Sequence, residues 1–262
     1  MNNSSLYYSV GPLLYCPANN ESIVSSLTNE KFGSKFSLAM CLEDTIRDDC
    51  VEEAEDKLIH SLHKLQKALE TKNFYMPKLF IRVRTPEQMQ RLIKASGSSA
   101  ALISGFIAPK FSLNNADSYI HAATLLNETG NHHFWFMPIF EDPLLIHLQK
   151  RNDILYSLKE KLDAISELVL NIRVGGNDLC NLFGFRRSSF ESIHSIKPVA
   201  NIFSDIITVY GTDYVVSGPV WEYYNGEGWD SGLINELKED RLNGFVGKTV
   251  IHPKQIPLVN QA

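Results

Sequence analysis

The segment LFIRVRTPEQ (residues 79–88) decides the fold, because its pattern changes from that of a strand to that of a helix. Residues 79–84 are mostly branched and apolar, as in a buried strand. Thr85 suits a helix N-cap, Pro86 the first helical position, and Gln88 the third position after the cap. We therefore predict a strand over residues 79–84 and a helix that starts directly after it.

The same strand-then-helix pattern recurs along the chain. The other expected strands are residues 13–17, 36–42, 102–108, 134–140, 168–174, 214–217 and 246–251. The expected helices include residues 51–69, 116–129, 198–210 and 233–244. Such alternation indicates a parallel sheet covered by helices, and 262 residues suit the roughly 250 of a (β/α)8 barrel. We predict an α/β protein, a single-domain TIM barrel over residues 1–262, with a short last helix and an open mouth.

Composition excludes several classes of protein. A net charge of −5 leaves no basic stripe for nucleic acid. The four cysteines form no CxxC pair, which argues against a zinc ribbon or a disulfide framework. No apolar run is long enough to span a membrane. We expect a reduced, cytoplasmic protein with neither nucleic acid nor membrane as a partner.

Charged side chains interrupt the expected third strand. Because strand side chains alternate between faces, Arg82 and Arg84 share one face with Phe80, and Ile81 and Val83 share the other. The apolar face should pack on helices, so both arginines should point toward the barrel axis. A buried guanidinium needs a carboxylate, a ligand or water. An internal ion pair and a ligand site both remain open.

Carboxylates follow the expected strands at the end where barrel active sites lie. They are Glu43, Asp44, Glu141, Asp142, Asp178 and Glu222. Two carboxylates from neighbouring strands could bind a hard divalent cation, with water and substrate oxygens completing its coordination. The alternative is helix capping, since Asp44, Asp142 and Asp178 all precede helical segments. We favour capping for Asp142 and leave Asp178 open.

These residues lie in motifs that resemble a known superfamily. The motifs are CLEDTI (41–46), IRVR (81–84), IAPK (107–110), PIFE (138–141), GGNDL (175–179) and GFVGKTVIHP (244–253). In this order they resemble the signatures of the citrate lyase β-subunit/HpcH–HpaI aldolase superfamily. RVGGNDL (173–179) and SGPVWEY (217–223) further resemble its branch of TIM-barrel carbon–carbon bond lyases, associated with tellurite-resistance and stress-response gene clusters.

The resemblance implies a Mg²⁺-dependent barrel enzyme that breaks or forms a carbon–carbon bond beside a carbonyl through a metal-stabilised enolate. By the matched motifs, Glu141 and Asp178 would bind the metal. Arg82 would act on the substrate carbonyl or carboxylate, and Glu43 and Asp44 would support Arg82 and the metal-bound waters. A metal ion and an arginine both stabilise developing negative charge.

Further basic residues are candidates for substrate binding. Arg84 and Lys110 belong to the matched motifs. Arg186 and Arg187 follow the sixth expected strand and could clamp a phosphate or a carboxylate, or could be a solvated pair. Ala18, Cys41, Arg84 and the Asp142-Pro143 pair depart from the superfamily pattern, so we expect an altered substrate pocket.

The primary hypothesis is a lyase or aldolase for an anionic keto- or hydroxy-acid derivative, with a CoA or carrier thioester and a phosphorylated compound as candidate forms. One alternative is another metal-enolate enzyme, such as an acyl-thioester hydrolase or a phosphoenolpyruvate-type enzyme. The other is a catalytically weak barrel that serves as a scaffold in a stress-response complex. By analogy with the superfamily, we also expect a homo-oligomer.

Overall fold

The computed structural model describes residues 5–130 and 132–262, so residues 1–4 and 131 of the expected domain lie outside it. Within the described part, eight parallel strands form a sheet in the order β7-β6-β5-β4-β3-β2-β1-β8. The two edges meet through a bridge between Gly218 and Lys248 and a 2.9 Å hydrogen bond from Val246 N to Val216 O. The sheet is therefore a nearly closed barrel, and the predicted (β/α)8 fold is confirmed.

The strands follow the expected order along the chain. They are β1 (Pro12–Pro17), β2 (Ser37–Cys41), β3 (Lys78–Arg82), β4 (Ile103–Ala108), β5 (Trp135–Phe140), β6 (Ile172–Val174), β7 (Val216–Ser217) and β8 (Lys248–Val250). The first five lie within two residues of their predicted ranges, but the last three are shorter. In β6 the predicted start was wrong, because turns occupy the residues after α6 and Val169 forms only an isolated bridge to Phe136.

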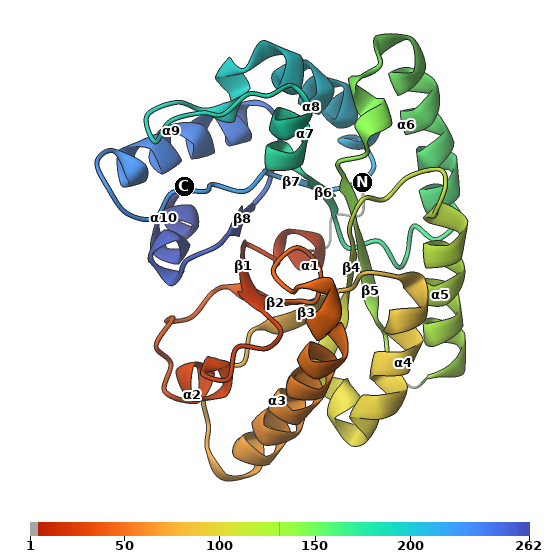
Figure 1. Cartoon of the computed structure of the whole chain (residues 1–262), viewed down its shortest axis with the longest axis vertical. Coiled ribbons are helices and arrows are strands. Elements are labelled where there is room, and N and C mark those ends of the chain that lie inside the picture. Colours follow the sequence, from red (N-terminus) through yellow and green to blue (C-terminus); the bar gives the residue numbers. More distant parts are fainter. Residues whose placement is uncertain (1–4, 131) are drawn as a thin grey trace.

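Helices surround the strands on the outside of the ring (Figure 1). They are α2 (Ile23–Thr28), α3 (Val51–Thr71), α4 (Pro86–Ser96), α5 (Ala116–Thr129), α6 (Leu148–Asp163), α7 (Gly176–Leu182), α8 (Lys197–Tyr210), α9 (Trp229–Leu242) and α10 (Ile256–Gln261). The last of these is short, as predicted. No helix of the described chain has both the length and the apolar composition to cross a membrane.

The boundary at residues 82–88 forms as predicted, but its hydrogen bonds differ. Thr85 is extended at the N-cap position of α4, and Pro86 occupies the first turn. The Thr85 side chain makes no capping hydrogen bond. Instead, Gln88 Oε1 accepts a 2.7 Å hydrogen bond from Arg84 N, one residue upstream of the cap. The predicted capping box is therefore replaced by a bond that fixes the end of β3.

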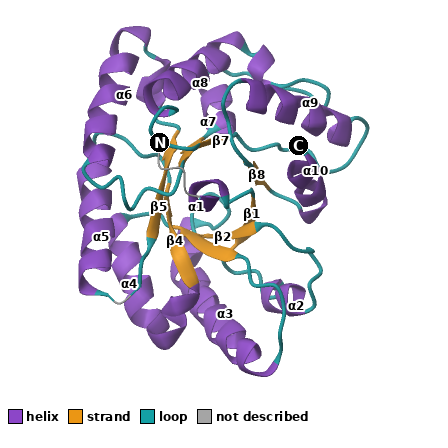
Figure 2. Cartoon of the chain, turned by 180° about the vertical axis from the view of Figure 1, so that it is seen from behind, coloured by secondary structure: helices purple, strands orange, loops and turns teal. Residues whose placement is uncertain are grey.

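An apolar plug fills the barrel interior below the carboxyl ends of the strands, toward the end where the strands begin. It consists of Val10, Leu13, Ala39, Phe80, Ile107, Met137, Ile139 and Leu170. Helix α1 (Ser5–Tyr8) lies over the centre of the ring (Figure 2), and its Leu6 and Tyr7 pack against the plug. A larger apolar layer separates the strands from the outer helices. Polar inward-facing side chains therefore lie at the carboxyl ends of the strands.

Candidate active site

Arg82, the last residue of β3, points into the barrel and is 6% exposed. Its Nη2 lies 2.7 Å from Glu43 Oε2, and its Nη1 lies 2.9 Å from Asp44 Oδ2. Glu141 Oε1 lies 3.5 Å from Nη2. The inward direction predicted from alternation is confirmed, and so is the internal ion pair. Three carboxylates, two after β2 and one after β5, therefore compensate the charge of this guanidinium.

Lys110, in the loop after β4, joins the same cluster. Its Nζ pairs with Glu43 and, at 3.3 Å, with Asp44. Its backbone N–H donates a 2.9 Å hydrogen bond to Glu141 Oε1. Lys110 has a φ of 49°, a left-handed conformation that is uncommon outside glycine. The loop therefore presents both the amide and the ammonium of one residue to the carboxylates.

Glu141 and Asp178 come from adjacent segments and interact directly. Glu141 follows β5 and is 4% exposed, while Asp178 lies in the first turn of α7. Burial raises the pKa of Glu141 to about 8, because the lowering effect of Arg82 is partly cancelled by the negative charge of Asp178. Gly175 precedes α7 and packs against Glu141, leaving no room for a Cβ atom. The backbone thus brings two carboxylates together in a poorly solvated place.

The structure shows which of the three aspartates Asp44, Asp142 and Asp178 is a helix cap. Asp142 is the N-cap of η3 (Pro143–Ile146), and its side chain accepts a 2.7 Å hydrogen bond from Leu144 N, which confirms the capping prediction. Asp178 is inside α7, whose N-cap position is Gly175. Asp44 pairs with Arg82 and Lys110. Of the three aspartates, only Asp142 is a helix cap.

A cavity of about 450 Å³ opens over this cluster at the carboxyl ends of the strands. Among the predicted site residues, Arg82, Asp44, Glu141 and Asp178 line it. The rest of its wall comes from β1, β6, the segment after β7, and β8. Glu43 and Lys110 support these residues from the side. The location is the one where TIM-barrel active sites lie.

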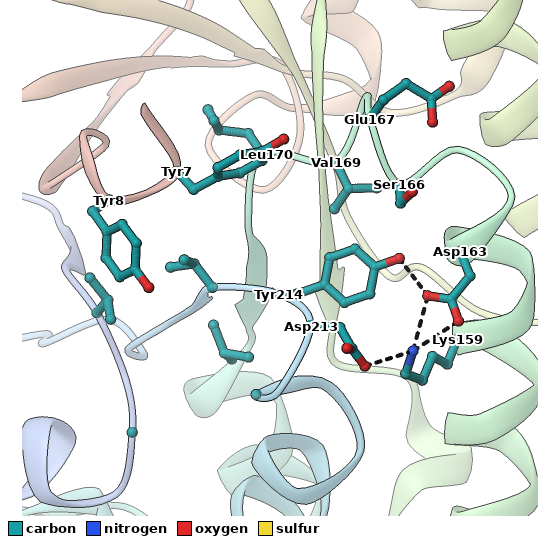
Figure 3. Close-up of a pocket in the computed structure, with 15 residues that line it drawn as sticks. Tyr7, Tyr8, Lys159, Asp163, Ser166, Glu167, Val169, Leu170, Asp213 and Tyr214 are labelled. Carbon is teal, nitrogen blue, oxygen red and sulfur yellow. Dashed lines mark hydrogen bonds and ion pairs between the residues drawn. The ribbon is translucent and has the colours of Figure 1, made fainter. Parts of the chain in front are cut away.

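A larger cavity, about 650 Å³, lies at the opposite end of the barrel, before the starts of β6, β7 and β8 (Figure 3). Four of its polar side chains are paired with one another. Lys159 Nζ lies 2.8 Å from Asp163 and 3.0 Å from Asp213, and the Tyr214 hydroxyl donates a 2.6 Å hydrogen bond to Asp163. Because convergent ionisable groups indicate a site better than size does, the smaller cavity is the candidate active site.

Arg84 does not share the site, contrary to the expectation from alternation. Its guanidinium binds the loop after β2, with Nε donating to Leu42 O at 2.6 Å and Nη1 pairing with Asp48 at 2.5 Å. Its Nη2 donates to Glu43 O at 3.1 Å. Strand β3 ends at Arg82, so the alternation that would turn Arg84 inward ends there too. Arg84 holds the loop that carries Glu43 and Asp44.

Arg186 and Arg187 diverge and do not form the predicted clamp. Arg186 is exposed and lies 3.5 Å from Glu222. Arg187 is 4% exposed, stacks on Trp221 and lies 3.4 Å from Glu236. It belongs to a buried network in which Lys248 also pairs with Glu236, at 2.9 Å. The predicted solvated pair is also wrong, because one member is buried.

Among the cavity residues to which the sequence analysis gave no role are Tyr15, Arg173 and Thr249. Arg173 lies in β6 between Ile172 and Val174. The reasoning applied to Arg82, a charge flanked by apolar residues in a strand, would have identified it. Tyr15 and Thr249 carry no such signal, because both residue types are common in strands.

The donor set fits a hard divalent cation. Arg82 and Lys110 pair with the carboxyl groups of Glu43, Asp44 and Glu141, and Asp178 interacts with Glu141, so four carboxyl groups gather around two cations. Across the described residues, no group of three His, Cys, Asp or Glu side chains is placed to share an ion. Two carboxylates with open positions suit Mg²⁺, which retains several water ligands, better than Zn²⁺, which takes three or four protein ligands.

Comparisons with known proteins agree with this architecture. A citrate lyase β subunit of Mycobacterium tuberculosis, complexed with oxaloacetate and magnesium, superimposes with a TM-score of 0.64 at 16% identity, covering 98% of each chain. CitE of the same organism, with magnesium, acetoacetate and coenzyme A, gives 0.63 at 14% identity, covering 98% of this chain and 81% of the other. RipC from Yersinia pestis gives 0.62 at 16% identity, covering 97% and 95%.

At such low identity these likenesses establish the fold alone. No curated protein matches the sequence significantly. A family model described as C–C bond lyase of the TIM-barrel fold matches residues 4–262, nearly the whole chain. The chain therefore belongs to the family of C–C bond lyases of the TIM-barrel fold.

Proposed function

We propose that this protein is a Mg²⁺-dependent carbon–carbon lyase or aldolase that acts on an anionic keto- or hydroxy-acid derivative. The observation that carries the proposal is the position of Arg82, Glu141 and Asp178 on the wall of one cavity. The solved neighbours bound to magnesium with oxaloacetate, pyruvate or acetoacetate support the choice of metal and substrate class. The neighbour with coenzyme A supports a thioester as one substrate form.

Glu141 and Asp178 are the residues that would hold the ion, each offering carboxylate oxygens. A bound Mg²⁺ would supply Lewis-acid stabilisation of the negative charge that develops on a substrate carbonyl oxygen when the bond breaks. Arg82 adds fixed positive charge beside that place, where electrostatic stabilisation is strong because water is scarce. Glu43 and Asp44 hold the guanidinium from two directions, so little reorganisation is needed.

Calorimetric titration with Mg²⁺ tests the proposal first. We expect wild type to bind the ion, and Glu141→Gln and Asp178→Asn to lose binding, because each removes one of the two anionic ligands. Glu167→Gln is the matched control, since Glu167 is an exposed carboxylate at the other cavity. No binding by wild type, or equal binding by Glu141→Gln, would overturn the metal site.

The activity needs a separate assay. Wild type with Mg²⁺ should release a keto acid or an acyl product from some member of a panel of hydroxy acids and acyl-thioesters, and Glu141→Gln should not. Failure across the panel despite tight Mg²⁺ binding would favour the scaffold alternative. A cytoplasmic location and a homo-oligomeric state remain predictions, and the second can be measured by sedimentation.

A further inference from the structure

The barrel interior contains a second buried arginine, and its surroundings differ sharply from those of Arg82. Arg173, in the middle of β6, is 2% exposed and lines the cavity. Its Cα pairs in register with Ile139 of β5 and Ser217 of β7. Ile139 belongs to the plug inside the barrel, so Arg173 shares the inward face. The two arginines flank Tyr15, whose pKa burial raises despite both positive charges.

No carboxylate of the described residues pairs with Arg173. Its Nη2 donates a 2.5 Å hydrogen bond to Thr249 Oγ1, and the Tyr15 hydroxyl acts on the guanidinium through both its charge and a hydrogen bond. Nε and Nη1 are buried without a hydrogen-bond partner in the described part of the chain, and so is Ser217 Oγ on the next strand. Arg82, by contrast, has three carboxylate partners.

This asymmetry has a physical cost. Burial lowers the pKa of Arg173, but arginine remains charged in proteins. A buried charge without a counterion is strongly destabilising, and folds normally pair it or replace it with an apolar residue. Arg151 shows the usual solution, because its Nη1 lies 2.7 Å from Asp205 and its Nε donates to Leu145 O. Arg173 instead combines two buried nitrogens that lack a hydrogen-bond partner with a position on the wall of a cavity open to ligands.

We propose that Arg173 is a specificity-determining residue that binds a second carboxylate of the substrate, so that the preferred substrates are dicarboxylic keto- or hydroxy-acid derivatives. This rests on the proposed function, in which Glu141, Asp178 and Arg82 act on the reacting carbonyl end. Because Arg82 is already compensated, the substrate's other anionic group is the counterion that Arg173 lacks. Guanidinium and carboxylate form strong charge-assisted hydrogen bonds in a buried site.

Two pairs of acids that differ by one carboxylate test this directly: malate against lactate, and 2-oxoglutarate against 2-oxobutanoate. Calorimetry with Mg²⁺ should show that wild type binds the dicarboxylate of at least one pair about tenfold or more tightly, the effect of one charge-assisted hydrogen bond. Arg173→Met should lose this preference and keep its affinity for the monocarboxylate. Equal binding within both pairs by wild type would overturn the inference.

A stability measurement separates this role from a purely structural one. Arg173→Met should keep or raise the melting temperature, because it replaces an uncompensated buried charge with an apolar side chain of similar volume. Arg151→Met is the matched control, since it removes a buried arginine from an ion pair away from the cavity. It should lower the melting temperature and leave the acid preference intact. If Arg173→Met lowers the melting temperature and retains the preference, Arg173 is structural and the inference is wrong.

The outcomes distinguish this inference from the proposed function. If wild type binds monocarboxylates in a Mg²⁺-dependent way but gains nothing from a second carboxylate, only the role of Arg173 fails. If wild type binds neither Mg²⁺ nor any of the four acids, the proposed function fails and the role of Arg173 fails with it.

Discussion

Gly175 packs so closely against Glu141 that a methyl group on its α-carbon would overlap the glutamate side chain. The φ of Gly175 is −90°, which other residues adopt easily, so the requirement for glycine comes from this contact and not from the backbone. One small residue thus permits the approach of β6 and α7 to the end of β5. Replacing it should displace Glu141 without changing any ionisable group.

We therefore expect Gly175→Ala to weaken Mg²⁺ binding about tenfold or more, as loss of a positioning contact around a metal ligand usually does. Calorimetry measures the affinity, and circular dichroism should show that the fold survives. An unchanged Mg²⁺ affinity in a folded Gly175→Ala protein would mean that Glu141 does not hold the ion.

The adjacent residues Arg186 and Arg187 should differ in their effect on stability. Arg187→Ala should reduce the free energy of unfolding by about 3–5 kcal/mol, because it leaves Glu236 with one fewer buried partner and exposes Trp221. Arg186→Ala should change it by less than about 0.5 kcal/mol, since its pair with Glu222 is exposed on the arginine side. Urea denaturation of the two variants makes the comparison, and equal losses would contradict the divergent placement.

Glu55 should make stability depend on acid pH. Burial raises its pKa, but hydrogen bonds from Arg91 and Gln88 outweigh this and hold the pKa below its usual value. Glu55 therefore binds a proton more readily in the unfolded chain than in the folded protein. Its contribution to the free energy of unfolding is fully present above the pKa of Glu55 in the unfolded chain. It is lost as the pH falls through the pKa of Glu55 in the folded protein. Glu55→Gln should be less stable than wild type at about pH 7, and the difference should shrink toward about pH 4. A difference that does not vary with pH would contradict this assignment.

The apolar plug should determine the stability of the barrel. Phe80 is fully buried in it, two residues before Arg82 on the same strand face. Phe80→Ala should cost about 3–5 kcal/mol of unfolding free energy, through lost burial and the cavity left behind. Phe80→Leu, which fills more of that space, should cost less. Urea denaturation tests both, and a similar small loss for the two variants would show that the plug can collapse around the gap.

The pattern of the third strand predicted the inward direction of Arg82 correctly and that of Arg84 wrongly. Arg82 points inward because it is still within β3, whereas Arg84 lies two residues past the strand, where the chain turns toward α4. Alternation holds only while a residue is in the sheet. The sequence does not mark the last residue of a strand sharply, so the inward direction of Arg84 could not be decided from its spacing.

Arg173 shows the opposite error. The rule of alternating strand faces would have identified it as inward-facing, but the sequence analysis gave it no role. The rule says only that a charge points inward; it says nothing about what the charge meets there. Arg187 illustrates this too, since its partner Glu236 comes from α9, far along the chain. Distances between side chains of different elements are not encoded in local pattern.

Local sequence pattern was enough to predict the order of strands and helices, the parallel barrel, and the clustering of Glu43, Asp44, Glu141 and Asp178 at one end. Periodicity and chain order suffice for these, because parallel strands bring their carboxyl ends together. Which cation each carboxylate compensates could be read only from the folded arrangement. Arg82 and Glu141 are 59 residues apart in the chain and belong to the ends of β3 and β5, which only β4 separates. They meet inside the barrel because loops, register and the missing side chain of Gly175 allow it. Charge pairing at close range depends on positions that differ by a few ångströms, and those are fixed by packing.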